Sequence, residues 1–193
     1  MTHPLTIALI QGSIRDTRFN DTIRALAERE LARHGFDLRI VDPRDPALLP
    51  LQTGDADATE RLRTLLSDID GAIVVTPEFN HSMPGALKTL IDSAKQEWEA
   101  RPVAFVSYGG VSGGLRAVEA LRPVFAELHA PTLREGVSIA MPWGRFEEDG
   151  TPKDAADAER LSAAFDTMAT SLDWWARTLR DGRAARPYGR KAA

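Results

Sequence analysis

The sequence of 193 residues contains no cysteine, which excludes disulfide bonds, thiolate metal sites, iron–sulfur clusters and a cysteine nucleophile. It also has no apolar run near the roughly 18 residues that a membrane span needs, so we expect no membrane partner. No basic segment precedes the first apolar run, so we expect no signal peptide and a cytoplasmic location. Redox chemistry in such a chain would require a bound cofactor.

The charges of the chain are nearly balanced, with 28 acidic and 24 basic side chains and a net charge of -4. This balance argues against a protein that wraps nucleic acid with its whole surface. From Arg177 onward, however, the net charge is +5, which leaves -9 for the rest. We predict that residues 181–193 form a disordered basic tail, with contact to a partner or nucleic acid as the alternative.

Short apolar runs alternate with longer amphipathic segments along the chain. The pattern predicts strands over 5–10, 37–41, 72–76, 103–107 and 137–140, and helices over 21–34, 58–67, 85–98, 113–129 and 155–179. Alternation of this kind indicates a single α/β domain over residues 1–180, in which helices cover both faces of a parallel sheet. Ligands bind such sheets beyond the carboxyl ends of the strands, so the loops there are the candidate site.

The loop after the first strand, residues 12–20, leads directly into a helix. Ser13 and Asn20 offer neutral hydrogen-bond donors, and Arg15 and Arg18 offer forked, charged donors that suit a phosphate. The loop lacks the glycine spacing of nucleotide triphosphatases and of dinucleotide-binding turns. The alternative is that Asn20 caps the helix and both arginines are solvated.

The loop after the third strand, residues 76–85, has proline near both ends, which fixes the backbone between them. Phe79 and His81 are placed to flank a planar ring. His81 is the one nearby group that titrates around neutrality, although a packing or capping role is favoured over proton delivery. Glu78 and Lys88 either serve the site or simply pair with each other.

The loop after the fourth strand, residues 107–116, contains four glycines within six residues. Glycine permits positive φ angles and leaves the backbone bare where a flat ligand would approach. No histidine has metal-ligand spacing and no serine lies in a G-x-S-x-G turn, so neither a metal site nor hydrolase chemistry is expected. We expect Trp174 and Trp175 to be buried against the sheet or a partner subunit, and Trp143 to pack in the core or an interface.

The three loops together resemble the NADPH-dependent FMN reductase family, a flavodoxin-like group that includes quinone, azo and chromate reductases. The residues that carry the resemblance are Gly12-Ser13-Ile14-Arg15 with Asn20, the run from Pro77 to Lys88, and the run from Tyr108 to Gly114. The resemblance implies a three-layer sandwich with a five-stranded parallel sheet in strand order 2-1-3-4-5. It also implies non-covalent FMN and a homodimer or homotetramer with flavin sites near subunit boundaries.

The resemblance also assigns roles to individual residues. The FMN phosphate would be held by Ser13, Arg15, Arg18 and Asn20. One edge of the flavin ring would be lined by Pro77, Glu78, Phe79 and Asn80, and the other by Tyr108, Gly109, Gly110, Ser112 and Gly113. Many members have serine in place of Arg18, which therefore either makes a charged contact or points outward. Phe79 and His81 replace tyrosines, and the second replacement leaves the acceptor preference open.

The resemblance implies an enzyme that transfers hydride from NADPH or NADH through FMN to quinones, azo compounds, chromate or free flavin in a ping-pong sequence. No protein side chain is assigned as a general base, because the cofactor carries the chemistry. The main alternative is an FMN-binding electron carrier that does not use a nicotinamide. A third possibility is a nucleic-acid-associated protein that acts through the basic tail.

Overall fold

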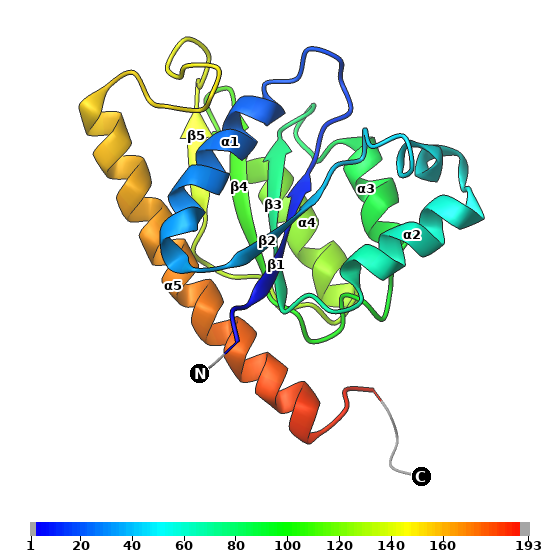
Figure 1. The fold of residues 1–193 in the computed structure, drawn as a ribbon. Helices are drawn as coiled ribbons and strands as arrows, with labels where there is room; N and C mark the ends of the chain where they lie inside the picture. The colour runs from blue at the N-terminus through cyan, green and yellow to red at the C-terminus, as the bar shows by residue number, and fades with distance from the viewer. Residues whose placement is uncertain (1–2, 190–193) are drawn as a thin grey trace.

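The computed structural model describes residues 3–189, and its centre is a parallel sheet in the order β2-β1-β3-β4-β5 (Figure 1). The strands are β1 (Thr6–Gln11), β2 (Asp37–Val41), β3 (Gly71–Pro77), β4 (Val103–Gly109) and β5 (Val137–Ala140). β1 pairs with both β2 and β3, so the strand order reverses beside it. This topology confirms the predicted flavodoxin-like sheet, in which the reversal point is where ligands bind.

Helices cover both faces of the sheet and form the outer layers of a sandwich. One layer holds α1 (Asn20–Leu31) and α5 (Ala155–Ala185), and the other holds α2 (Ala56–Leu66), α3 (Gly85–Asp92) and α4 (Leu115–Glu127). Two short 3₁₀ helices, η1 (Ala32–His34) and η2 (Leu49–Thr53), lie in the connections. Within residues 3–189, no helix combines the length and apolar character that crossing a membrane requires.

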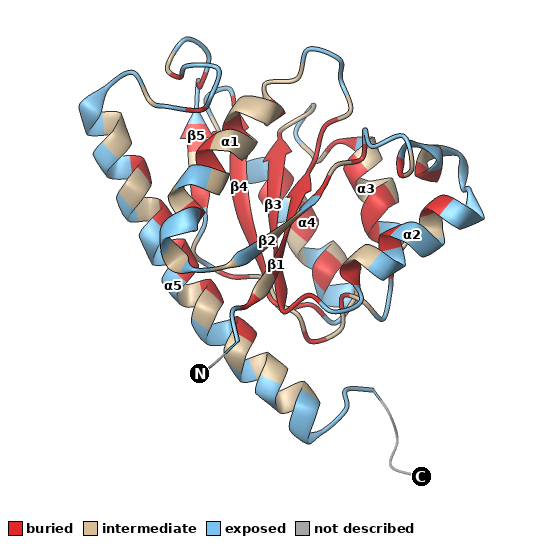
Figure 2. Ribbon diagram, in the orientation of Figure 1, coloured by how far each residue is buried: buried red, intermediate tan, exposed pale blue. Residues whose placement is uncertain are grey.

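The central strands β1, β3 and β4 are buried on both faces and are red in Figure 2, whereas the edge strands β2 and β5 are partly exposed. In β1, Ile7 and Leu9 pack in the core beneath α1 and α5, while Ala8 and Ile10 pack in the core beneath the other three helices. A strand covered on both sides needs apolar residues at successive positions, which explains why continuous apolar runs predicted β1, β3 and β4 well.

Two helices of the second layer are shorter than predicted. The helix expected over 85–98 ends at Asp92, where the Ser93 hydroxyl donates to the Thr89 carbonyl at 2.8 Å. The indole of Trp98 then folds back, is fully buried and donates to the Ile91 carbonyl at 3.0 Å. The helix expected over 113–129 begins at Leu115, because the two preceding glycines have positive φ angles.

α5, by contrast, continues to Ala185, beyond the predicted end at residue 179. The added turns are held by Arg183, which donates to the Ala100 carbonyl at 2.5 Å, and by Arg180, which lies 3.4 Å from Asp70. Residues 181–185 are therefore helical, which contradicts this part of the predicted disordered tail. Residues 190–193 of that tail lie outside the described residues.

Candidate functional site

The loop between β1 and α1 is fixed to β3 at both ends. The backbone N–H of Gly12 donates to the Val75 carbonyl at 2.8 Å, and the side-chain amide of Asn20 donates to the same carbonyl at 3.0 Å. A Cβ atom on Gly12 would lie 3.0 Å from both the Thr76 Oγ1 atom and the Val75 carbonyl oxygen, so glycine permits this close approach. Asn20 is fully buried and so holds the loop from beneath, rather than presenting its side chain at the open surface.

Arg18 lies inside this loop, and the protein itself engages its guanidinium. Its Nη1 donates to the Ser13 carbonyl at 2.6 Å and to Asp42 at 2.7 Å, and its Nη2 donates to Asp42 at 2.5 Å and to Asp21 at 2.7 Å. Its Nε donates to Asp21 at 3.0 Å. All five N–H groups therefore have acceptors, and only 4% of the side chain is exposed. This position differs from both expectations, because Arg18 neither offers a donor to a phosphate nor points outward.

The partner of Arg18, Asp42, was not singled out by the sequence. Its carboxylate also accepts the side-chain amide of Gln11 at 3.0 Å and the backbone N–H of Arg44 at 2.8 Å. Burial alone would raise the pKa of Asp42, but the hydrogen bonds from Arg18 and Arg44 outweigh it and lower this pKa. Asp42 directly follows the strand at 37–41, so the rule that drew attention to the other post-strand loops could also have found it.

Arg15 lies in quite different surroundings from Arg18. Its guanidinium carbon lies 3.8 Å from the centroid of the Phe79 ring, and within residues 3–189 the guanidinium donates to no protein acceptor. The Ser13 hydroxyl oxygen accepts the Arg15 backbone N–H at 3.4 Å, and the hydroxyl proton has no protein acceptor within residues 3–189, although Ser13 is only 2% exposed. In the same described part of the chain, the backbone N–H groups of Ile14, Asp16 and Thr17 also lack protein acceptors. This set of charged and neutral donors fits a phosphate group.

The loop after β3 forms a tight turn from Phe79 to Ser82. The N–H of each of these two residues donates to the carbonyl of the other, at 2.9 and 3.1 Å. The central residues Asn80 and His81 have φ angles of 48° and 70°, the left-handed pair that a type I′ turn requires. The turn fixes Phe79 beneath Arg15 and leaves Asn80 and His81 exposed at its tip.

Glu78 joins this second loop to the third. Its carboxylate accepts the Ser112 hydroxyl at 2.6 Å, the Arg116 backbone N–H at 3.1 Å and the Arg116 Nη1 at 2.9 Å. Burial alone would raise the pKa of Glu78, but these hydrogen bonds lower it. The alternative pairing of Glu78 with Lys88 is wrong, because Lys88 pairs with Asp92 at 2.5 Å. Arg116 is thus a site residue whose structural role the sequence did not reveal.

The glycines of the third loop serve two different purposes. Gly113 has a φ of 61°, and its carbonyl accepts the hydroxyls of Ser107 and Ser138 at 2.9 and 3.0 Å. A Cβ atom there would lie 2.3 Å from the Ser138 oxygen, so the turn requires glycine. A Cβ atom on Gly110 would meet nothing within 4 Å, so this residue leaves bare backbone at an open surface.

The remaining predicted residues support the loops from below. The Tyr108 ring is buried, and its centroid lies 6.0 Å from the centroid of the Phe19 ring. Burial raises the pKa of the Tyr108 phenol. Pro77 is the buried last residue of β3 and pairs with Tyr108, whose carbonyl accepts the Glu78 N–H at 3.1 Å. Gly109 is also buried, with the Glu78 Cβ atom 3.4 Å from the position a Cβ atom would take. These residues shape the site without presenting side chains to it.

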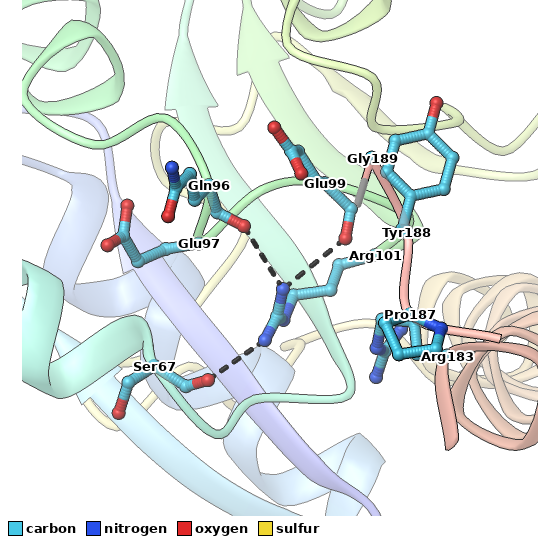
Figure 3. A pocket seen from close by; sticks show the side chains of 9 residues that line it. All are labelled: Ser67, Gln96, Glu97, Glu99, Arg101, Arg183, Pro187, Tyr188 and Gly189. Atoms are coloured by element: carbon cyan, nitrogen blue, oxygen red, sulfur yellow. Dashed lines mark hydrogen bonds between the residues drawn. The ribbon is translucent and has the colours of Figure 1, made fainter. Parts of the chain in front are cut away.

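A separate cavity of about 620 Å³ lies at the opposite, amino-terminal end of the strands (Figure 3). Within it, Arg101 donates to main-chain carbonyls, including that of Ser67 at 2.8 Å. Burial and the neighbouring charge of Arg101 lower the pKa of Arg183 to about 10. Glu97 and Glu99 line the same cavity, so it does not offer charge of one sign. None of the predicted site residues lies there, and among residues 3–189 no three His, Asp or Glu side chains converge as metal ligands.

The strand order and the three loops define a flavodoxin-like α/β protein with hydrogen-bond donors gathered at the carboxyl edge of its sheet. Comparison with known proteins is more specific. Residues 5–144 match the family of NADPH-dependent FMN reductases, and the chain belongs to that family. It is therefore an oxidoreductase that uses FMN with NAD(P)H, and the predicted family and cofactor are confirmed.

Individual relatives agree with this assignment. The chain is 33% identical over 146 residues to a quinone reductase of Pseudomonas putida, covering 69% of this chain and 76% of that protein. It is 28% identical over 179 residues to an NAD(P)H-dependent FMN reductase of Saccharomyces cerevisiae, covering 81% and 93%. Among solved structures, the NAD(P)H:(acceptor) oxidoreductase FerB of Paracoccus denitrificans shares the fold, with a TM-score of 0.71, 22% identity and coverage of 88% and 97%.

Proposed function

We propose that the protein oxidises NADPH, or NADH, and reduces a small-molecule acceptor in a ping-pong sequence. The proposed acceptors are quinones, azo compounds, chromate and free flavin. Relatives of the chain are named as quinone reductases and an NADPH azoreductase. FMN, when bound, supplies the hydride chemistry, while the protein positions the reactants. The observation that carries the proposal is the contrast between the two arginines of the first loop. Arg18 fixes the loop, and Arg15 stays available for an anion.

The proposed contacts follow from this contrast. Ser13, Arg15 and the backbone N–H groups that follow them would hold the phosphate. Arg18 and Asn20, which the resemblance places on the phosphate, would instead keep the loop in shape. The flavin ring would lie between the second and third loops, bounded by Pro77, Glu78, Phe79 and Asn80 on one side and by Tyr108, Gly109, Gly110, Ser112 and Gly113 on the other.

An oligomer with flavin sites near its subunit boundaries is part of the same proposal. Four large apolar side chains are exposed on and beside the third loop: Val111, Leu115, Met141 and Trp143. Val111 is 92% exposed, and the backbone N–H of Met141 donates to the Gly109 carbonyl at 2.8 Å, so these side chains gather at one edge of the site. Apolar surface of this kind favours contact with a second copy. A cytoplasmic location remains a prediction.

The test is a sequence of spectra on the protein saturated with FMN. NADPH added without oxygen should bleach the flavin absorbance, and a benzoquinone added after removal of the oxidised nicotinamide should restore it. Steady-state double-reciprocal plots at several quinone concentrations should be parallel. Intersecting plots would contradict the ping-pong sequence. Flavin that NADPH and NADH both fail to bleach would contradict the enzyme and indicate an electron carrier.

A further inference from the structure

The outer face of α5 exposes two tryptophans. Trp174 is 61% exposed and Trp175 is 38% exposed, and their rings are nearly perpendicular with centroids 5.2 Å apart. The face of α5 that packs on the sheet consists of Leu161, Phe165, Met168, Ala169, Leu172 and Ala176. With 3.6 residues per turn, Trp174 lies diametrically opposite that face. Neither ring is buried against the sheet, which contradicts one of the two positions expected for them.

Small side chains surround Trp174 on this outward stripe. Ala163, Thr167, Thr170 and Thr178 follow one another at intervals of four, three and eight residues, and all are exposed. A shallow, open hollow lies beside Thr167 and Thr170, one to two turns before Trp174, and it is also lined by Glu135, Asp166 and Ser171. One face of α5 therefore carries both a projecting tryptophan ring and a hollow whose polar side chains can accept a hydrogen bond from an indole N–H.

We propose that this α5 face binds the α5 face of a second copy, with the two helices antiparallel. A twofold axis beside Thr170 and Ser171 would bring Trp174 against the partner's Thr167, so each ring would enter the other copy's hollow. Contacts of this kind are isologous, because each side supplies the same projection and the same recess, and the pair closes on itself.

The charges along α5 favour the antiparallel arrangement over a parallel one. The same axis brings Arg160 opposite the partner's Asp181, and it places the partner's Arg177 two residues, about 3 Å along the helix, from the position opposite Asp166. Asp166 and Arg160 are both about half exposed and each already belongs to an ion pair within the chain, with Arg33 and Asp157 respectively. In a parallel pair in register, each charged side chain would face the identical side chain of the partner. Repulsion between these like charges favours the antiparallel pair.

The proposed contact is long enough for a stable interface. From Arg160 to Asp181 the helix runs about 32 Å at 1.5 Å per residue. Two helices in contact over that length, with flanking side chains, approach the roughly 800 Å² per partner of a standard interface. The surface is separate from the apolar edge beside the flavin loops, so the inference does not depend on the proposed function.

The absence of cysteine from the chain provides a direct test. Thr170→Cys places one thiol per subunit beside the proposed axis, where the two Cα atoms fall within the roughly 7 Å that a disulfide spans. Thr178→Cys is the matched control, because it lies on the same exposed stripe but would face the partner's Ala163. Mild oxidation should link Thr170→Cys into covalent dimers and leave Thr178→Cys unlinked. No dimer from Thr170→Cys, or equal dimer from both variants, would overturn the proposal.

Sedimentation of the FMN-loaded full chain tests the interface without a cross-link. Trp174→Glu should raise the dissociation constant for the α5 contact at least tenfold, as expected for a central aromatic anchor. Asp181→Arg should also weaken association, and adding Arg160→Asp to it should restore association by exchanging the charges. Circular dichroism checks that each variant is folded. A wild-type chain that stays monomeric, or an assembly that Trp174→Glu leaves unchanged, would contradict the proposed contact.

Discussion

Arg18 and Asp42 face each other through two parallel hydrogen bonds, 2.7 and 2.5 Å long, which join the loop after β1 to the end of β2. The two residues lie on either side of α1 in sequence, and their pairing fixes the loop before any ligand arrives. A loop already in its bound shape loses less conformational entropy on binding. We therefore expect the pair to contribute to cofactor affinity without touching the cofactor.

Replacing Arg18 should destabilise the fold. In Arg18→Met, Asp42 and Asp21 lose their shared cation, and the free energy of unfolding should fall by about 2 kcal/mol, less than for a fully buried pair because both carboxylates reach solvent. Urea unfolding measures the change. Arg24→Met is the control, because its pair with Glu28 on the helix surface should be worth at most about 0.5 kcal/mol. Equal losses in the two variants would show that the Arg18 network contributes no more to the free energy of unfolding than a surface ion pair does.

The same pair predicts a dependence of stability on pH. The pKa of Asp42 is lowered in the folded state from an ordinary value of 3.8, so its contribution to stability is fully present above pH 3.8 and is lost as the pH falls through the lower folded value. The stability advantage of the wild type over Asp42→Asn should therefore shrink on acidification. Urea unfolding of both proteins at pH 7 and pH 3 provides the measurement. A constant difference would argue against this role of Asp42.

Arg15 should affect FMN binding rather than folding. Loss of a charge-assisted contact in Arg15→Ala should weaken FMN by about 1.5 to 3 kcal/mol. Fluorescence titration with FMN measures the change. Arg44→Ala is the matched control, since Arg44 carries the same charge near the loop but lies beside Asp16. If Arg44→Ala weakened FMN as much as Arg15→Ala, general positive charge rather than a specific contact would explain the affinity.

His81 should act through its backbone conformation. Its φ of 70° suits glycine and penalises a β-branched residue, so His81→Val should lose about 1 to 2 kcal/mol of stability while His81→Gly should lose none. Thermal or urea unfolding separates the two variants. NADPH oxidation by His81→Gly should keep the pH profile of the wild type. A profile that changed in His81→Gly would assign His81 a part in proton transfer.

The accuracy of prediction from sequence varied with how local the determining contacts are. Strand Val137–Ala140 was predicted with its observed bounds because the apolar Val137 and Ile139, both buried, alternate with less buried residues and leave a local signal in the sequence. The end of α5 depends on Arg183, which contacts the Ala100 carbonyl 83 residues away and leaves no such signal. Near the end of α3, the Trp98 indole folds back onto the Ile91 carbonyl, a tertiary arrangement that the apolar pattern does not reveal. In the site, position after a strand identified the right loops. It did not distinguish Arg15 from Arg18, because the difference lies in Asp42, 24 residues further along the chain.

The carboxylate of Glu78 couples the second and third loops, so that they move together. Because it accepts the hydroxyl of Ser112 and the first-turn N–H of Arg116, the start of α4 cannot shift without carrying the turn at Phe79 with it. The tips of the two loops, His81 and Val111, lie outside this linkage and are exposed. If these loops hold the cofactor as proposed, substitutions at the tips would change the acceptor preference while the linked frame stays unchanged.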